Sequence, residues 1–528
     1  MTLNDLLDEA ARRAPQGPAL VTPEETLSFS ELQRRVLFVA AGFSARGIGK
    51  NDAVAIVHRN SPVFVISYFA LARLGAVAVP INFMVQKPDE LAYMLNDCQA
   101  KGIVTQSEFL KGLRGAAAKA RSVAMIWVSD PIADEKGERP REEPFSNLLQ
   151  EPAALSYPQA QDQDTVAILY TSGTTGNPKG VMLTHRNLAS NAVAGVKKLA
   201  IRPNDVQLAL LPMFHIFGWT ANVLVSLLAR TKLVISPSIT PPRPWLGLMA
   251  KHGVTMFSAV PQLFSILAKQ ATGLQGLVLR YWFFRKVRLA VSGAAPLSPV
   301  VLEAFEKNLR VPIVEGYGLT ETAPIISVNP VEKRKPGSVG TMIDGVKVRI
   351  IDDQEHDLEL GQEGEICVKG DNVMKGYYNL PQATREAFTT DGWFKTGDIG
   401  ALDSEGYLYI RDRKKDMIII KGLKVFSAQV ESVMLEHPDV QEAALIGIPD
   451  EHGDETIKAF VVLKKGASTD KSGLMQFCRS KLDPYKRPRD IEIVEALPKN
   501  ALQKVLKRAL RQRELDKRTA APPSSGPA

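Results

Sequence analysis

The chain has 528 residues, of which 45% are hydrophobic and 23% are charged. This length allows a large core in more than one domain, and the composition is that of a globular protein rather than a disordered or fibrous one. The net charge of +8, from 65 basic and 57 acidic residues, permits anionic partners. We find no nucleic-acid-binding motif, which argues against nucleic acid as a partner.

The first residues and the cysteines favour a cytoplasmic protein. Residues 1–15, MTLNDLLDEAARRAP, have the pattern of an amphipathic helix and lack the basic-then-apolar order of a signal peptide. Cys98, Cys367 and Cys478 lie far apart, with neither metal-ligand spacing nor a disulfide framework. We therefore expect a reducing compartment.

The most membrane-like stretch is 62–83, PVFVISYFALARLGAVAVPINF. Arg73 lies at its centre, where a charge costs roughly 2.5–3.5 kcal/mol to insert into a bilayer. Gly75 and Pro80 also interrupt the apolar run. The pattern predicts a buried helix followed by a buried strand, and no transmembrane span.

Apolar runs alternate with helical patterns up to about residue 410. The strand-like runs include DAVAIVHR, AVAVPINF, TVAILY, VQLALLPM and KLVISP. Such alternation predicts an α/β fold of layered sheets and helices with mostly buried strands. The polar stretch 130–164 is rich in Pro, Glu, Arg and Gln, so we expect a surface excursion or linker there.

The pattern changes in the last third of the chain. Residues 340–410 hold short strands between Gly, Asp and Asn turns, which predicts a β-rich subdomain. A compact α+β pattern follows, and the chain is expected to be disordered from about residue 517. We predict a large N-terminal domain, 1–412, and a small mobile C-terminal domain, 413–528.

The strongest local motif is YTSGTTGNPKGV, residues 170–181. Its glycines let the backbone approach a polyanion, successive N–H groups can form an anion-binding nest, and Lys179 adds a point charge. A flexible linker would not need the buried strands on both sides, and the P-loop pattern GxxxxGK[ST] is absent. The candidate phosphate ligands are Thr171, Ser172, Gly173, Thr174, Thr175, Gly176 and Lys179.

This motif resembles the phosphate loop of the adenylate-forming enzymes, which include acyl- and aryl-CoA synthetases, peptide-synthetase adenylation domains and luciferases. The resemblance continues in family order from about residue 25 to residue 510. It implies that the enzyme uses ATP and Mg²⁺ to convert a carboxylic acid into an acyl-AMP and then transfers the acyl group to coenzyme A. It also implies that the C-terminal domain rotates about a hinge near Lys415 between the two steps.

SGAAPLS, residues 292–298, follows the strand-like run VRLAV. Small residues at a strand end leave room for a flat ring, and the resemblance places Ala294 at the border of the adenine. The same segment could instead be a helix N-terminus with Pro296 near the first turn.

EGYGLTET, residues 315–322, combines an aromatic face, glycines and oxygen ligands. Tyr317 can stack on adenine, and Thr320 can donate to the α-phosphate. Glu321 suits Mg²⁺, which takes one or two carboxylates besides nucleotide phosphates. Thr-Glu-Thr could also be turn or capping chemistry. The resemblance implies that Glu315, Gly316 and Tyr317 bind the nucleotide and that Thr320 and Glu321 are catalytic. It also implies that Glu321 binds the metal together with Thr171 of the phosphate loop.

His215, in LPMFHIFGW, is a lone histidine among apolar neighbours, which is more often structural than catalytic. The resemblance nevertheless places it beside the reacting carboxylate. Asp398, in GWFKTGDIG, could accept both ribose hydroxyls or could close a turn.

RDRKKDMIIIKG, residues 411–422, is a charge run of the kind that usually marks a solvated face. The resemblance assigns Arg413 to the ribose, Lys415 to the hinge, and Lys421 with Gly422 to the pantetheine of coenzyme A.

In PKNALQKVLK, residues 498–507, the resemblance makes Lys504 the lysine that holds the carboxylate and the α-phosphate during adenylation. An ammonium suits the charge that develops in that transition state. Gln503 stands where the family most often has glycine, which puts the path of this loop in doubt.

For the acid we expect a medium- or long-chain fatty acid, because the segments 214–228, 260–267 and 323–327 are apolar and lack a charged specificity residue. An aryl-CoA (coumarate-like) ligase would differ only in this pocket. A stand-alone peptide-synthetase adenylation enzyme would share the first step, although no carrier domain follows Lys504. A phosphotransferase would release ADP or phosphate instead of AMP.

LRYWFFRKVR, residues 279–288, holds four consecutive aromatics, and its basic residues are Arg280, Arg285, Lys286 and Arg288. A packed helix end is one interpretation. Four consecutive aromatics cannot all face one core from a helix, so one or two should reach the surface. Tyr, Trp and basic side chains together favour peripheral contact with the inner face of a membrane.

Overall fold

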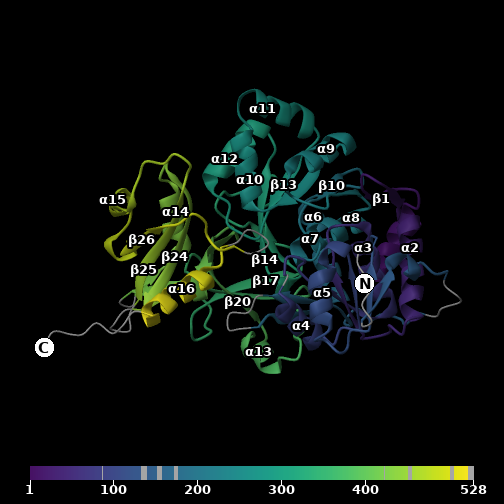
Figure 1. Ribbon diagram of the computed structural model, residues 1–528. Helices are drawn as coiled ribbons and strands as arrows, with labels where there is room; N and C mark the ends of the chain where they lie inside the picture. Colours follow the sequence, from purple (N-terminus) through teal and green to yellow (C-terminus); the bar gives the residue numbers. More distant parts are fainter. Residues whose placement is uncertain are drawn as a thin grey trace. The chain divides into compact units, whose positions relative to one another are not determined.

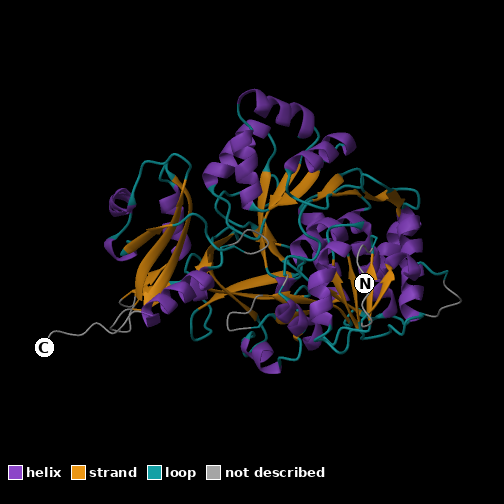
Figure 2. Ribbon diagram, in the orientation of Figure 1, coloured by secondary structure: helices purple, strands orange, loops and turns teal. Residues whose placement is uncertain are grey.

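The computed structural model describes residues 1–85, 87–131, 140–151, 157–171, 177–420, 423–449, 455–499 and 505–520, with side chains up to 517. It confirms a mixed α/β fold (Figures 1 and 2). The chain forms two compact units, one of residues 1–348 and 368–394 and the other of residues 349–367 and 395–528. The predicted domain boundary at 412 stays a prediction.

The first unit holds an eight-stranded sheet in the order β19-β9-β8-β4-β3-β5-β6-β7. Strands β8, β4, β3, β5, β6 and β7 run parallel, and β9 is antiparallel to both β8 and β19. The bounds are β3 Ala53–Val57, β4 Val77–Pro80, β5 Gly102–Thr105, β6 Met125–Val128, β7 Arg141–Pro144, β8 Thr165–Thr171, β9 Lys179–Thr184 and β19 Gly376–Tyr377.

Helices cover this sheet. One core cluster joins the strands to α4 and α5. The helices of this part are α1 Leu3–Arg13, α2 Phe29–Ser44, α3 Pro62–Leu74, α4 Pro88–Asp97, α5 Leu110–Ala117, α6 His185–Lys198 and α13 Pro381–Glu386.

The same unit holds a nine-stranded sheet in the order β16-β15-β14-β13-β12-β10-β11-β1-β2. Its core cluster joins β10, β12, β13 and β14 to the helices α9, α10 and α12. The strands are β1 Pro18–Val21, β2 Thr26–Ser28, β10 Val206–Ala209, β11 Lys232–Ile235, β12 Met256–Ala259, β13 Leu289–Ser292, β14 Ile313–Gly318, β15 Ile325–Val328 and β16 Thr341–Met342. The helices are α7 Ile216–Gly218, α8 Val225–Ala229, α9 Pro242–His252, α10 Pro261–Gln270, α11 Gly273–Val278 and α12 Pro299–Leu309.

The stretch 62–83 forms the predicted buried helix and strand, α3 and β4. Ser61 caps the helix by accepting a hydrogen bond from the Phe64 N–H at 3.2 Å, and Pro62 occupies the first turn, where a missing N–H costs nothing. Gly75 ends the helix at φ 67°, a left-handed conformation that favours glycine. Among the residues that the structure describes, no helix is long and apolar enough to cross a membrane.

The second unit contains most of a four-stranded sheet, β17-β18-β20-β21, and a three-stranded sheet, β24-β25-β26, so the predicted β-rich and α+β regions are present. The strands are β17 Val346–Ile351, β18 Gly364–Gly370, β20 Phe394–Leu402, β21 Leu408–Arg413, β22 Ile418–Ile420, β23 Leu423–Val425, β24 Val440–Pro449, β25 Glu455–Leu463 and β26 Asp490–Ile493. The helices are α14 Ser427–Leu435, α15 Lys471–Lys481 and α16 Lys507–Ala520. Helix α16 therefore continues past residue 517, where we expected disorder to begin.

Part of the polar stretch 130–164 is not a surface excursion. Strand β7 pairs in parallel with β6 at the edge of the eight-stranded sheet. Its Glu142 and Glu143 are buried because Arg114 and Arg46 pair with them at 2.7 and 2.8 Å. The polar composition of this stretch predicted a loop, whereas two paired glutamates lie in a buried edge strand.

Candidate nucleotide and acyl-transfer site

The predicted phosphate loop lies between two antiparallel strands, as its flanking apolar residues indicated. Thr171 ends β8 and lies opposite Lys179, which begins β9. The Thr171 hydroxyl donates to the Lys179 carbonyl at 3.5 Å. The candidate ligands 172–176 lie outside the described residues, so their role stays a prediction.

The two predicted adenine segments begin within adjacent parallel strands, β13 and β14. Ser292 of β13 lies opposite Glu315 of β14, so SGAAPLS and EGYGLTET leave the same edge of the nine-stranded sheet. Ligands of α/β sheets bind at the carboxyl ends of strands. Ala294 has φ 70°, and helix α12 begins only at Pro299, so Pro296 does not start a helix.

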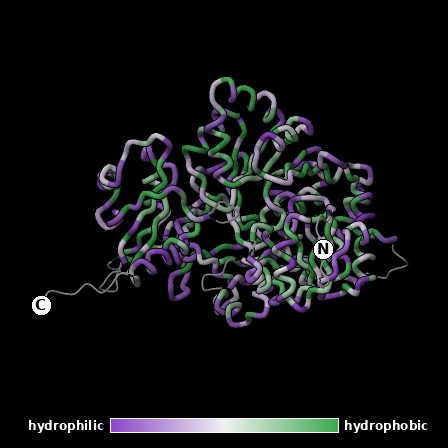
Figure 3. Tube along the Cα trace, in the orientation of Figure 1, coloured by the Kyte–Doolittle hydropathy of each residue, from purple (hydrophilic) through white to green (hydrophobic). Residues whose placement is uncertain are grey.

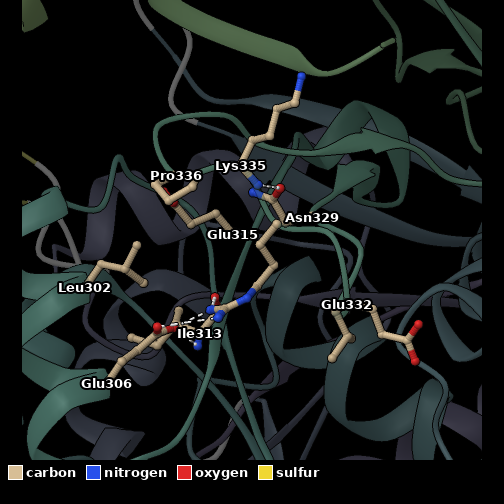
Figure 4. Close-up of a pocket in the computed structure, with 10 residues that line it drawn as sticks. Leu302, Glu306, Ile313, Glu315, Asn329, Glu332, Lys335 and Pro336 are labelled. Atoms are coloured by element: carbon tan, nitrogen blue, oxygen red, sulfur yellow. Dashed lines mark hydrogen bonds and ion pairs between the residues drawn. The ribbon is translucent and has the colours of Figure 1, made fainter.

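Glu315 lines a pocket of about 230 Å³ between β14 and α12 (Figure 4). Burial raises the pKa of its carboxyl to about 7, although the N–H groups of Leu297 and Gly337 counteract this by stabilising the ionised form. On the pocket wall Arg334 donates to the Ile313 carbonyl at 2.8 Å and pairs with Glu306. A carboxyl that titrates near neutral pH therefore lies inside the predicted nucleotide motif.

Tyr377 contacts two predicted ligands, although it lies outside every motif found in the sequence. Its hydroxyl donates to Glu321 Oε1 at 3.1 Å, and Lys179 Nζ lies 4.9 Å from the centre of its ring. Burial and the adjacent carboxylate raise the pKa of the phenol, so it remains a donor. The pairing of β19 with β9 brings Tyr377 close to Glu321 and Lys179, and no local sequence pattern identifies Tyr377 as a site residue.

Buried amides hold the Thr-Glu-Thr turn that follows β14. Asn191 of α6 donates to Ile325 O at 2.7 Å and accepts from its N–H at 3.0 Å. Asn372 donates to Thr322 O at 3.0 Å, and Thr220 donates to Ala323 O at 3.0 Å. These side chains are almost completely buried, so the turn that carries Thr320 and Glu321 is rigidly supported.

His215 lies two residues before Phe217, whose ring packs on the SGAAPLS motif. It caps α7, where its Nδ1 accepts from the Phe217 N–H at 3.2 Å. The Phe217 ring lies so near Gly293 that an added Cβ there would be 3.0 Å from it. The cap accords with the structural interpretation of His215, and its catalytic role stays a prediction.

The acyl-pocket segments are mostly buried. Residues 216–228 form α7, a π-helix at Trp219–Leu224 and α8, and 261–267 lie in α10. Trp219 stacks on Tyr68 with ring centres 4.0 Å apart, and Phe214 contacts Phe83 edge-on at 5.3 Å.

In the second unit, the two residues predicted to bind ribose are neighbours. Asp398 of β20 lies opposite Arg413 of β21, with Arg413 Nε 3.6 Å from Asp398 Oδ1. Asp398 is only 6% exposed. Lys415 follows in a 3₁₀ turn, Lys414–Asp416, in which Lys414 pairs with Asp353 and Glu365 at 2.9 Å. Lys421, Gly422 and Lys504 lie outside the described residues.

The fold and the arrangement of these motifs define an adenylate-forming, carboxylate-activating enzyme. The chain belongs to the AMP-binding enzyme family, whose model matches residues 7–378, and the model of the AMP-binding enzyme C-terminal domain matches residues 429–504.

Known relatives support this membership. The long-chain-fatty-acid–CoA ligase of Salmonella typhimurium is 35% identical over 541 residues, covering 97% of this chain and 94% of the relative. ATP-bound MatB from Rhodopseudomonas palustris has a TM-score of 0.88 at 31% identity, covering 98% of this chain and 100% of that one. The Mycobacterium tuberculosis fatty acyl CoA synthetase has a TM-score of 0.76 at 31% identity, covering 98% and 99%.

Proposed function

We propose that this chain is an AMP-forming acid–CoA ligase that acts on medium- or long-chain fatty acids. The observation that carries the proposal is that Tyr377 contacts a residue from each of two predicted nucleotide motifs, Glu321 after β14 and Lys179 at the start of β9. Its full-length similarity to a long-chain-fatty-acid–CoA ligase supports the choice of acid.

In the first step the carboxylate attacks the α-phosphorus of ATP, pyrophosphate leaves and an acyl-AMP remains. A general base is unnecessary because a carboxylate is already ionised at neutral pH. The rate therefore depends on positioning and on stabilising negative charge, which we assign to Lys179, Thr320 and Lys504.

The residues present fit a Mg²⁺ ion held mainly by the nucleotide. Among the residues that the structure describes, no group of three His, Cys, Asp or Glu side chains could hold a metal. Mg²⁺ at nucleotide sites needs only one or two carboxylates. Glu321, oriented by Tyr377, is the proposed protein ligand, with Thr171 beside the phosphate loop. When bound, the ion would neutralise charge on the phosphates.

In the second step the thiol of coenzyme A attacks the acyl carbon and AMP leaves. We assign Asp398 and Arg413 to the ribose, and Lys421 with Gly422 to the pantetheine. Lys415 is the proposed hinge, and Lys504 acts only in adenylation.

A half-reaction assay tests this division. Lys504→Ala should abolish pyrophosphate release from ATP and acid, yet largely spare thioester formation from supplied acyl-AMP and coenzyme A. Equal loss of both half-reactions would contradict the assignment.

A substrate panel tests the acid. With acids from acetate to palmitate, together with benzoate and cinnamate, we expect AMP and pyrophosphate with medium- or long-chain acids. A preference for the aromatic acids would identify an aryl-CoA ligase, and release of ADP would refute the whole proposal.

A further inference from the structure

The last helix, α16, begins with a lysine whose side chain is mostly buried. Lys507 is its first residue and follows Lys504 by three positions. The trace of α16 is largely hydrophilic in Figure 3, whereas the strands β24 and β25 are largely hydrophobic. A cation at the start of a helix lies at the unfavourable end of the helix dipole. The position of Lys507 therefore requires specific partners.

Lys507 lies between two acceptors of helix α14. Its Nζ is 2.7 Å from Glu431 Oε1 and donates to Ser427 Oγ at 2.6 Å. The Lys507 and Glu431 side chains are only 14% and 17% exposed. Glu431 also accepts from the Leu445 N–H of β24 at 2.7 Å, so two elements fix the carboxylate that holds the ammonium.

A second carboxylate continues this chain of hydrogen bonds. The buried Ser427 hydroxyl donates to Asp412 Oδ2 at 2.7 Å, and the Ala428 N–H donates to the same oxygen at 3.3 Å. Asp412 precedes Lys415, the proposed hinge, whereas Ser427 and Lys507 follow it. The chain of hydrogen bonds from Lys507 to Asp412 therefore spans the hinge.

Arg511 adds a contact with the hinge turn itself. It lies one turn after Lys507, on the same face of α16, and pairs with Asp416 at 3.1 Å. Asp416 ends the 3₁₀ turn that contains Lys415. Helix α16 is thus connected to residues on both sides of the hinge.

The chain immediately before α16 is held by its own backbone. Val505 pairs with Lys499 in an antiparallel bridge, and the Leu506 N–H donates to the Pro498 carbonyl at 2.8 Å. Lys507 follows directly, so a displacement of Lys507 would be transmitted to the end of this segment.

Lys507 also compensates buried negative charge. Burial raises the pKa of the Glu431 carboxyl and the nearby Asp412 raises it further, whereas Lys507 lowers it. Removing one partner of a buried ion pair leaves the other charge uncompensated. Loss of the ammonium should therefore loosen the start of α16 from α14.

We propose that Lys507 is a positioning residue for the adenylation step. By joining α16 to Glu431 and, through Ser427, to Asp412, it fixes the chain that follows Lys504 relative to the hinge. Lys507 acts through Lys504 and not by touching ATP or the acid. The inference rests on the proposed function, in which Lys504 acts in adenylation and not in thioester formation.

The two half-reactions, measured on the full chain, test the proposal. Lys507→Met removes the ammonium and keeps most of the side-chain length. We expect kcat for pyrophosphate release from ATP and palmitate to fall at least about tenfold, because small misplacements near reacting groups are costly. Thioester formation from supplied palmitoyl-AMP and coenzyme A should stay near the wild-type rate. Lys507→Arg keeps the charge and several donors, so it should restore most of the adenylation rate.

Two lysines of the same unit are matched controls. Lys458 of β25 is 11% exposed and pairs at 2.7 Å with Glu514, two turns further along α16. Lys481 pairs with Glu436 at the end of α14 at 3.2 Å, and both side chains are about half exposed. Lys458→Met should lower the thermal midpoint, yet neither Lys458→Met nor Lys481→Met should reduce adenylation selectively.

Ser427→Ala tests the same chain of hydrogen bonds without a change of charge. It removes the bond to Asp412 and should reduce adenylation by a smaller factor, with thioester formation again spared. Thermal midpoints measured in parallel identify any loss of folded protein. If Lys507→Met does not fold, unchanged adenylation in Ser427→Ala overturns the proposal.

Three other results would also overturn it. These are an equal reduction of both half-reactions in Lys507→Met, the same selective loss in Lys458→Met, and no recovery in Lys507→Arg. Wild type that releases no AMP with any acid would instead refute the proposed function. The two failures are distinguishable, because this inference predicts losses only in the variants.

Discussion

Replacing Gly318 with alanine should displace the turn that carries Thr320 and Glu321. An added Cβ would lie 1.8 Å from the Pro324 carbonyl oxygen, whereas real Cβ contacts are essentially never shorter than 3.0 Å. The two backbone segments would have to separate by more than about 1 Å. The same Pro324 oxygen accepts a hydrogen bond from the Leu319 N–H at 3.1 Å, so this bond would be disrupted. Gly318, the second glycine of EGYG, is therefore required for the close approach of β14 to the Pro324 backbone.

The size of the effect follows from this displacement. A misplacement of 1 Å near reacting groups can reduce the rate about a hundredfold, and overpacking costs about 1–3 kcal/mol of stability. We expect Gly318→Ala to reduce kcat/KM for ATP–pyrophosphate exchange by about two orders of magnitude. Gly195→Ala in α6 is the matched control, because its Cβ would meet only two side chains, Ile325 at 3.2 Å and Val225 at 3.7 Å, and a small adjustment suffices.

The assay is ATP–pyrophosphate exchange at saturating fatty acid, with the thermal midpoint of each variant measured in parallel. The effect on exchange should exceed what loss of folded protein explains. If Gly318→Ala exchanges pyrophosphate at the rate of Gly195→Ala, then the close approach to Pro324 does not position the turn, and the reasoning is refuted.

Three further predictions concern single side chains. Burial raises the pKa of Glu315 from 4.5 to about 7, so the native chain binds more protons than the unfolded chain between these values. The free energy of unfolding should therefore fall by up to about 3 kcal/mol as pH rises through this window, and thermal midpoints compared with Glu315→Gln should reveal it. Tyr377→Phe removes the hydrogen bond that orients Glu321, so the Mg²⁺ concentration needed for half-maximal adenylation should rise, and an unchanged requirement would remove Tyr377 from that role. Lys415→Pro should hinder domain rotation, so adenylation should survive better than thioester synthesis, and wild-type rates in both half-reactions would exclude the hinge.

Local patterns were sufficient for several of the buried strands and for the helix that follows β3. Apolar runs with β-branched residues predicted β3, β4, β8, β10 and β11, and helix caps such as Ser61 with Gly75 are visible in the sequence. The motifs after β8, β13 and β14 were found because loops that follow buried strands carry distinctive glycines, hydroxyls and carboxylates. These features depend on neighbours a few residues away, which a sequence displays directly.

Tertiary contacts decided the remainder. Strand β7 exists because arginines from other elements neutralise Glu142 and Glu143, and Tyr377 reaches Glu321 because β19 pairs with β9. Likewise, only packing against Phe257 and Phe305 determines that Phe284 is buried while Trp282 is exposed. Each outcome depends on residues tens to hundreds of positions apart, whose charge pairing and burial no local periodicity records.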